Sequence, residues 1–213
     1  MKMSYTKPEG FISGEYYHVY NRGVEKRNIF DNEADYKRFR SSLKDFNSTD
    51  PAWKIEWAKE KGEILKGEML VEIVAYCLNP NHFHLLLKQI RDNGISDFMR
   101  KLGTGHTMYF NKKHDRSGVL FQGKFKSVHV KDNNHLLYLS AYVNRNYFIH
   151  GYGDDANWPY SSLWDYTGER DGKICEKGVI LDKFKDKKDY QKFIQENALY
   201  MKEKKEDEKY LLE

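Results

Sequence analysis

Two apolar segments on either side of a short turn constrain the fold of this chain more than any other feature. They are MLVEIVAYCL (residues 69–78) and HFHLLLKQI (residues 82–90), separated by Asn79, Pro80 and Asn81. Apolar and β-branched residues dominate both segments, as they do in buried strands, and Asn and Pro favour turns. The pattern therefore predicts an antiparallel β-hairpin.

Two more segments have the composition of strands. EYYHVYNRG (residues 15–23) is rich in aromatic and β-branched residues and ends in a turn, and GVLFQGKFKSVHVK (residues 118–131) resembles a second strand. The polar residues 47–68 contain Trp53 and Trp57 but no clear strand, and we interpret them as an insertion.

Apolar residues at helical spacing predict two helices between these strands. The first covers residues 31–47, with Asp31 or Asn32 as its N-cap, and the second covers residues 94–115, where two glycines weaken the pattern. The resulting order, β-α-β-β-α-β, is that of the split ferredoxin-like (RRM-like) unit. It predicts an α+β fold, a four-stranded antiparallel sheet with both helices on one face and the first and third strands in the centre.

The second strand of the hairpin begins with two histidines at the spacing H-x-H. Residues i and i+2 of a strand point to the same face, so His82 and His84 project together. Neutral imidazole is a common ligand of divalent cations, and two of them make half of a metal site. In a chain with eight histidines, the pair is equally compatible with a polar strand end beside a turn.

A third predicted helix, over residues 133–151, brings further polar groups toward the histidines. Asn133 or Asn134 is its predicted N-cap, and Gly151 a natural stop. Tyr142 and Asn146 are four residues apart and share one face. If this helix crosses the open face of the sheet, two imidazoles and an amide oxygen could surround a divalent ion, with a phenol beside it. Tyr138, one turn earlier, is the rival tyrosine.

The net charge of +4 conceals a marked asymmetry. Residues 1–150 hold 24 Lys and Arg against 17 Asp and Glu, whereas residues 151–213 hold 12 against 15. Between residues 100 and 131 there are eight basic residues and one acidic residue. Basic segments attract polyanions, of which nucleic acid is the common one, although a solvated charged surface explains the same pattern.

Other features indicate the cellular compartment. The apolar runs are too short to span a membrane, and residues 1–14 contain no apolar stretch of the kind found in signal peptides. Neither Cys77 nor Cys175 belongs to a C-x-x-C motif, and a small buried strand residue is the expected role of Cys77. We therefore expect a cytoplasmic protein with no membrane partner.

Five stretches of this sequence together resemble the HUH single-tyrosine transposases, and most closely the REP-associated tyrosine transposases. They span roughly residues 12–168 in the family's order. The stretches are YHVYNRGVEKRNIF, AYCLNPNHFHLLLKQ, GISDFMRKLGTGHTMYFNKKHDRSGVLFQGKFKS, LLYLSAYVNRN and WPYSSLWDYTG. An H-x-H alone is common, but an H-x-H in this context, followed by a Y-x-x-x-N helix, is highly specific.

The resemblance implies a metal-dependent endonuclease and strand transferase that acts on single-stranded DNA near imperfect hairpins. His82 and His84 would be the HUH pair, Tyr142 the nucleophile and Asn146 the third ligand of Mg²⁺ or Mn²⁺. The product would be a 5′-phosphotyrosine and a free 3′ hydroxyl. The resemblance also implies an HUH nuclease domain over residues 1–150 and an extension over 151–213 with an amphipathic charged helix, in a monomer or a homodimer. A bacterial-type, nucleoid-associated protein is implied by the same resemblance.

Seven residues are candidates for DNA binding. Three of them share one face of the predicted fourth strand, since their spacing is two, and the others are basic residues nearby. The seven are Arg22, Lys112, Lys113, Arg116, Gln122, Lys124 and Lys126.

The sequence departs from the family pattern where Asn-Pro is replaced by Asn146-Tyr147, so the helix is expected to continue to about Ile149. Asn144 becomes a competing ligand, but at i+2 it points away from Tyr142. His18 matches the family, yet a satisfied strand histidine is its expected role, and Trp158 is expected to be a packing anchor.

Three other functions compete with this interpretation. The first is a domesticated module that binds hairpin DNA and does not cut it, although such a binder has no need of both histidines and Tyr142. The second is a zinc hydrolase, for which no general-base carboxylate lies near the H-x-H in sequence. The third is an RNA-binding ferredoxin-like domain, whose aromatic signature is absent from the sequence.

Overall fold

A computed structural model describes residues 10–63, 67–153 and 158–210, and it contains one four-stranded antiparallel sheet. The strands are β1 (Tyr16–Arg22), β2 (Val71–Asn79), β3 (His82–Gln89) and β4 (Lys126–His129). Their spatial order is β2-β3-β1-β4, so β1 and β3 are central, as the ferredoxin-like order predicts. The α+β prediction and the hairpin are confirmed.

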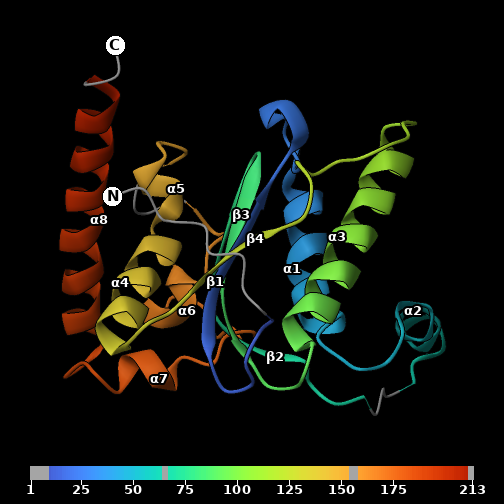
Figure 1. Cartoon of the computed structure of the whole chain (residues 1–213), viewed down its shortest axis with the longest axis horizontal. Coiled ribbons are helices and arrows are strands. Elements are labelled where there is room, and N and C mark those ends of the chain that lie inside the picture. The colour runs from blue at the N-terminus through green and yellow to red at the C-terminus, as the bar shows by residue number, and fades with distance from the viewer. Residues whose placement is uncertain (1–9, 64–66, 154–157, 211–213) are drawn as a thin grey trace.

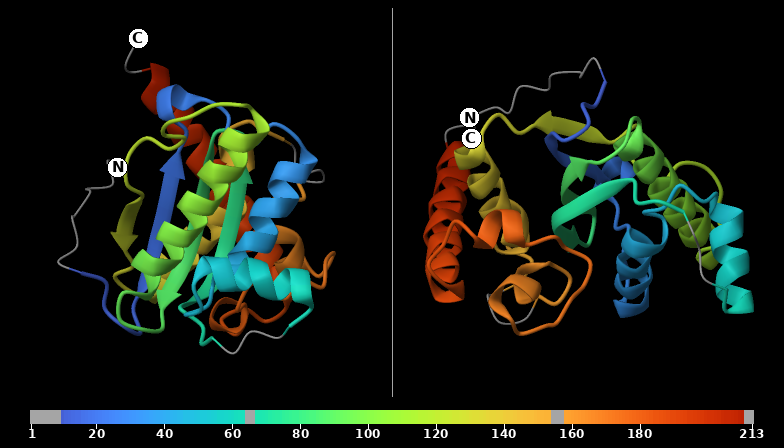
Figure 2. Two further views of the ribbon diagram at one scale, coloured as in Figure 1. Left: turned by 90° about the vertical axis from the view of Figure 1, so that its right-hand side faces the viewer. Right: turned by 90° about the horizontal axis from the view of Figure 1, so that it is seen from below.

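Helices cover both faces of this sheet (Figure 1). The helix α1 (Glu33–Asp45) and the helix α3 (Gly94–Lys113) lie side by side on one face, as predicted. The opposite face carries α4 (Asn133–Asn144), which packs on β2 and β3. Figure 2 shows the sheet between these two helical layers. The third helix therefore crosses the open face of the sheet, where the histidine argument requires it.

Local signals explain where α1 begins and how α1 and α3 pack. Asn32 caps α1, and its side chain and that of Asp35 satisfy each other's backbone amides in a capping box. The helix α3 continues through both of its central glycines. Gly105 lies against the ring of Phe46 just after α1, where a Cβ atom would come within 2.7 Å of the ring. A glycine that weakens helix propensity here allows two elements to approach closely.

The structure differs from the sequence expectation in the fourth strand. The expected strand over residues 118–131 is wrong in its length, because β4 begins only at Lys126. Gly118 and Gly123 have φ angles of +89° and +77°, which are turn conformations and not extended ones. Only an isolated bridge between Gly23 and Phe121 continues the pairing. The expectation that Gln122, Lys124 and Lys126 share one strand face is therefore also wrong.

The expected third helix needs correction in its continuity and in its N-cap. The helix over residues 133–151 is interrupted at Arg145, where φ is −111° and ψ is 13°, and it resumes as α5 (Asn146–Ile149). Its N-cap is Asp132, which accepts a hydrogen bond from the backbone amide of His135. Within the expected insertion, the structure forms α2 (Ala52–Lys61), on which both tryptophans are exposed.

Three further helices follow α5. They are α6 (Leu163–Thr167), α7 (Gly178–Leu181) and α8 (Lys187–Tyr210). A short 3₁₀ turn, η1 (Val24–Lys26), follows β1. The helix α8 packs along α4 and α5, and its buried residues belong to the same apolar cluster as β2 and β3 residues on this face. Cys77 and Cys175 are free and buried. Within the described ranges, no helix is both long and apolar enough to cross a membrane.

Candidate active site

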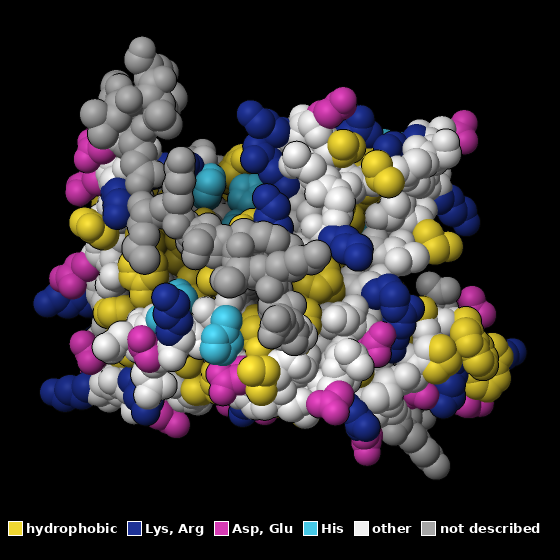
Figure 3. Space-filling model, viewed as in Figure 1, with side chains coloured by type: hydrophobic (Ala, Val, Ile, Leu, Met, Phe, Trp, Pro, Cys, Tyr) yellow, Lys and Arg dark blue, Asp and Glu magenta, His cyan; other side chains and the backbone are white. Residues whose placement is uncertain are grey.

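A pocket of about 440 Å³ lies where the ends of β1 and β3 meet the helical layer that contains α4. Its lining comes from the sheet, the hairpin turn before β3, the loop before β4, α4, the residues after α5, and α8. In the space-filling view, histidines lie in a hollow bordered by Lys and Arg side chains (Figure 3). The lining residues are Tyr20, Asn21, Arg22, Asn81, His82, His84, Gln122, Lys126, Tyr142, His150, Tyr152 and Lys205.

The turn of the hairpin determines the tautomer of His82. Nδ1 of His82 lies 2.6 Å from Oδ1 of Asn81. Because Nδ2 of Asn81 donates to the carbonyl of Lys26, Oδ1 must accept the proton of His82 Nδ1. A neutral His82 therefore carries its free electron pair on Nε2, and Nδ2 of Asn79 donates to that atom at 3.0 Å.

The first strand holds the second histidine. Nδ1 of His84 lies 2.8 Å from Nε2 of His18, and the two rings are stacked. If Nδ1 of His84 donates this hydrogen bond, its Nε2 has an electron pair available for the pocket. His18 is buried with its Nδ1 unpartnered among the described residues. His18 thus directly contacts a candidate ligand, beyond its expected role as a satisfied strand histidine.

Asn146 reaches the same place from the start of α5. It is completely buried, and its Oδ1 accepts a hydrogen bond from Asn79 Nδ2 at 2.7 Å. The same oxygen lies 3.3 Å from Nε2 of His82, although 64 residues separate them. The competing Asn144 is bonded elsewhere, to Tyr190 and Ser162. The interruption at Arg145 does not disturb the expected proximity of Asn146 and His82.

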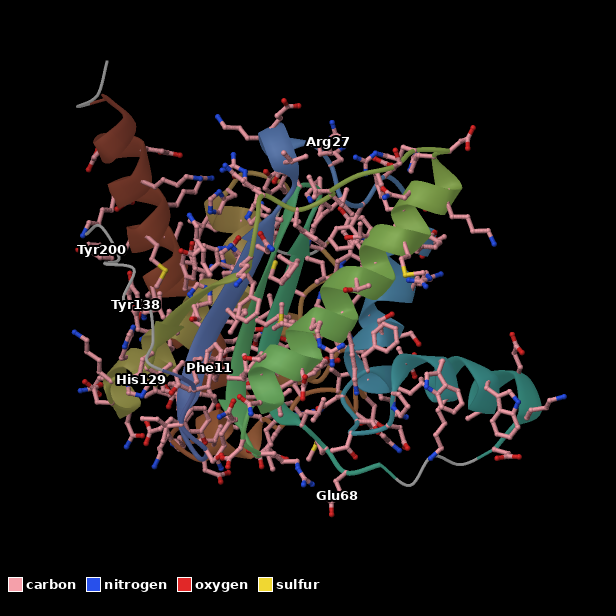
Figure 4. The ribbon with its side chains drawn as sticks, turned by 45° about the vertical axis from the view of Figure 1, so that its right-hand side comes forward. Phe11, Arg27, Glu68, His129, Tyr138 and Tyr200 are labelled. Atoms are coloured by element: carbon pink, nitrogen blue, oxygen red, sulfur yellow. The ribbon has the colours of Figure 1, made fainter. Side chains whose placement is uncertain are left out.

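The structure brings Tyr142, and not Tyr138, to the histidines. The ring of Tyr142 lies 5.5 Å from that of His84 and 5.7 Å from that of His18, edge to face in both cases. Tyr138 is 40% exposed and does not line the pocket. It lies on the outer side of the helical layer with Tyr200 of α8 (Figure 4).

Burial sets the protonation states of these groups. It lowers the pKa of His82 to about 4, with Asn146 acting in the opposite direction, and it lowers the pKa of His84 well below 6.5. Both imidazoles are therefore neutral at pH 7, as metal ligands must be. Burial also raises the pKa of Tyr142 to about 12, against the opposing effect of the Asn146 amide. The phenol is protonated at neutral pH.

These groups fit a divalent cation. Nε2 of His82 and Oδ1 of Asn146 both carry electron pairs and lie close together. Nδ2 of Asn79 donates a hydrogen bond to each of these two atoms. The buried Nδ2 of Asn146 has no hydrogen-bond partner among the described residues. His82, His84 and Asn146 are the residues that could hold the ion. A group of three His, Cys, Asp or Glu side chains suitable for a metal does not occur in the described part of the chain.

The candidate DNA-binding residues occupy separate places. Arg22, Gln122 and Lys126 line the pocket with the histidines. Lys124 lines a different hollow, between α3 and the loop before β4. Lys113 binds both carboxylate oxygens of the buried Asp35, at 2.8 and 2.7 Å.

The last two candidates lie at the end of α3. Lys112 belongs to its final turn, and Arg116 donates to the carbonyl of Val119 at 3.0 Å. The seven candidates are therefore not gathered at one place.

Sequence reasoning missed several residues of the pocket. Asn79 and Asn81 were interpreted only as turn residues, although each contacts one nitrogen of His82. The ring of His150 lies 5.1 Å from that of His82, and Nζ of Lys205 binds His150. No local pattern marks His150 or Lys205, since long-range packing brings them to the site. Trp158 is a packing anchor as expected, and it donates to the carbonyl of Leu78.

Comparison with known proteins places this chain among the transposases. It belongs to the IS200-like transposase family, whose sequence model, described as "Transposase IS200 like", matches residues 12–146. The match contains the H-x-H pair, Tyr142 and Asn146. Comparison with curated protein sequences finds no match.

Solved structures are similar to this chain at low sequence identity. A REP-associated tyrosine transposase bound to a REP hairpin is 15% identical, with a TM-score of 0.54, and the alignment covers 82% of this chain and 98% of that one. A Deinococcus radiodurans R1 protein described as a transposase is 18% identical, with a TM-score of 0.38, over 62% of this chain and 90% of that one.

Proposed function

We propose that this protein cuts single-stranded DNA beside imperfect hairpins and rejoins strands through a covalent bond between Tyr142 and a 5′ phosphate. The observation that carries this proposal is the convergence of Tyr142, His84 and His82 on one pocket. The cationic side chains of Arg22 and Lys126 line the same pocket and suit a phosphate. A hairpin substrate is supported by the REP hairpin bound to the REP-associated tyrosine transposase of similar fold. A single-stranded substrate is what the resemblance of the sequence implies.

In the proposed step, Oη of Tyr142 attacks the phosphorus atom of a phosphodiester. The bond from phosphorus to the 3′ oxygen breaks, a 5′-phosphotyrosine forms, the phenol loses its proton and the departing 3′ oxygen gains one. One phosphoester replaces another, so the step needs no external energy source. A free 3′ hydroxyl can reverse it and so join the same or a different strand.

The surrounding residues prepare this attack. Because the pKa of Tyr142 is about 12, little phenolate exists at neutral pH, and the attack needs assistance. A divalent ion, Mg²⁺ or Mn²⁺, held by His82, His84 and Asn146 would supply Lewis-acid activation of the phosphate. His18 and Asn81 hold the Nδ1 atoms of the two histidines and so orient the rings. Such a protein would act in the cytoplasm, at the nucleoid.

The test is a covalent adduct on a denaturing gel. The protein is incubated with Mn²⁺ and labelled single-stranded hairpins whose flanks are randomised, because the recognised sequence is unknown. We expect an adduct with wild type and with Tyr138→Phe, and none with Tyr142→Phe, since only the last loses the attacking oxygen. Peptide mapping of the adduct should identify Tyr142.

Two results would contradict the proposal in different ways. An adduct that persists in Tyr142→Phe would assign the nucleophile to another residue. Hairpin binding by the wild type without any adduct would instead indicate a binding module that does not cut. Tyr142→Phe should bind the hairpin as the wild type does, because the ring and its packing remain.

A further inference from the structure

The C-terminal helix contributes a cation to the active-site pocket. Nζ of Lys205 on α8 donates to Nδ1 of His150 at 2.9 Å and to the carbonyl of Ile149 at 3.2 Å. Lys205 lines the pocket that contains both histidines and Tyr142. It lies beyond residue 146, where the family match ends.

The sequence of α8 directs Lys205 to this position. The buried residues of the helix are Tyr190, Ile194, Ala198 and Met201, which follow one another at intervals of three or four. This spacing defines one helix face, which packs on α4 and α5. Lys205 follows Met201 by four residues, so it occupies the place on this face where the next apolar residue would be expected. The packing of α8 therefore brings an ammonium group to the pocket.

The surroundings of Lys205 are suited to an anion. Both acceptors of its hydrogen bonds are uncharged, since Nδ1 of His150 accepts and the other group is a backbone carbonyl. Arg22 and Lys126 also line the pocket, and the described residues of its lining include no carboxylate. A cation held by neutral groups above such a pocket can bind a phosphate without first breaking an ion pair inside it.

His150 positions this cation relative to the candidate ligands. Its ring is 5.1 Å from that of His82 and 6.4 Å from that of Tyr152. Because Nδ1 of a neutral His150 accepts from Lys205, its proton is on Nε2. The imidazole of His150 thus lies between Nζ of Lys205 and the ring of His82, and it is the one side chain that links α8 to the histidine pair in this series of contacts.

We propose that Lys205 binds the scissile phosphate and stabilises the negative charge on its non-bridging oxygens while Tyr142 attacks. This role rests on the proposed cleavage activity and assigns α8 to the catalytic machinery. The proton and bond changes of the step are those given above, and Lys205 keeps its protons throughout. A purely structural role would instead have Lys205 cap the last carbonyls of α5, as lysines near helix C-termini do.

The test compares three variants of the full chain in single-turnover cleavage of a hairpin substrate that the wild type cuts. Lys205→Met should lower the cleavage rate at saturating DNA by about 10–100-fold, as the loss of one charged hydrogen bond predicts. Lys205→Arg should recover most of this rate, because it restores the charge. Lys204→Met, a neighbouring exposed lysine that does not line the pocket, should cleave like the wild type.

The outcomes separate this role from its alternatives. Cleavage by Lys205→Met at the wild-type rate, with or without a lowered melting temperature, overturns the proposal and leaves the capping role. A weaker affinity for DNA at an unchanged saturating rate overturns it as well, because it indicates a contact to a flanking phosphate. Absence of an adduct in the wild type is a failure of the proposed function itself, which the first experiment detects separately.

Discussion

At the scale of single residues, the pocket depends on which nitrogen of each histidine carries the proton. Asn81 accepts from Nδ1 of His82, and Asn79 donates to its Nε2. Nε2 of His18 lies 2.8 Å from Nδ1 of His84. These contacts leave the Nε2 atoms as the candidate ligand atoms. We therefore expect the residues around the H-x-H pair to matter for the proposed activity, although they need not touch DNA.

The first residue-scale prediction concerns the metal ligands. His82→Ala or His84→Ala should lower cleavage by more than about a hundredfold, and EDTA should abolish cleavage by the wild type. His18→Phe should weaken metal affinity by about 10–100-fold, since it removes the partner that orients His84. Asn146→Ala should have the mildest effect, because a water molecule can replace one amide oxygen. Cleavage rates over a Mn²⁺ titration measure all four variants, and full activity in EDTA would exclude the metal.

At the scale of elements, close packing explains features that helix propensity alone does not. The helix α3 contains two glycines two residues apart, and they have different surroundings. Nothing lies within 4 Å of a Cβ atom built on Gly103, whereas one built on Gly105 lies 2.7 Å from the ring of Phe46. Gly103 weakens the helix without a gain in packing, whereas Gly105 lets α3 approach the end of α1.

This contrast predicts opposite effects on stability. Gly103→Ala should raise the free energy of unfolding by about 0.5–1 kcal/mol, because alanine is the better helix former. Gly105→Ala should lower it by about 1–3 kcal/mol, because the new methyl group displaces the ring of Phe46. Urea denaturation of both variants measures the effect. Equal changes in the two would show that α3 and α1 are not packed as described.

Two basic residues, one at the end of α3 and one at the start of β4, also act at the scale of elements. Lys126 lines the pocket and Lys113 binds the buried Asp35. Each phosphate that a lysine neutralises contributes about 0.7 to the slope of log affinity against log salt for single strands. Lys126→Ala should therefore flatten this slope by about 0.7. Lys113→Met should leave the slope unchanged and destabilise the fold by about 2–3 kcal/mol, since it leaves a buried carboxylate without its cation.

Binding isotherms at several salt concentrations distinguish these two lysines. A flattened slope in Lys113→Met, with stability retained, would return Lys113 to the DNA-binding surface. An unchanged slope in Lys126→Ala would mean that the phosphate backbone runs outside the pocket.

At the scale of the whole molecule, buried histidines link stability to pH. His106 is far from the pocket in the core of the α1 and α3 layer, where its Nε2 donates to the carbonyl of Ile29. Burial lowers its pKa to about 4. An unfolded histidine takes up a proton near pH 6.5, so the unfolded state binds more protons between pH 6.5 and 4. The stability that the neutral His106 contributes is therefore fully present above pH 6.5, and it is lost as the pH falls toward 4.

The predicted contribution of His106 to this loss is about 2 kcal/mol between pH 7 and pH 5. His106→Gln keeps a hydrogen-bond donor but cannot take up a proton. Its free energy of unfolding should therefore decrease less than that of the wild type over this interval, by about the same 2 kcal/mol. Urea denaturation at the two pH values provides the measurement. Equal losses in both proteins would show that His106 does not titrate as described.

The sequence by itself determined what depends on neighbours along the chain. Alternation within a strand put His82 and His84 on one face, and the Asn79-Pro80-Asn81 turn indicated the hairpin. The order of the elements was sufficient to predict the sheet, because the split ferredoxin-like unit has few topological alternatives. The four-residue spacing of Tyr142 and Asn146 correctly put both on the side of the sheet that carries the histidines.

Only the tertiary structure decided which distant residues meet at the pocket. Asn79 and Asn146 are 67 residues apart, and Lys205 and His150 are 55 apart. No local period relates such pairs, since their proximity follows from the packing of α4, α5 and α8 on the sheet. The sequence pattern also did not predict the length of β4, because the turn conformations of Gly118 and Gly123 interrupt a segment of strand-like composition. Local sequence specifies faces and turns, and burial of those faces against each other builds the site.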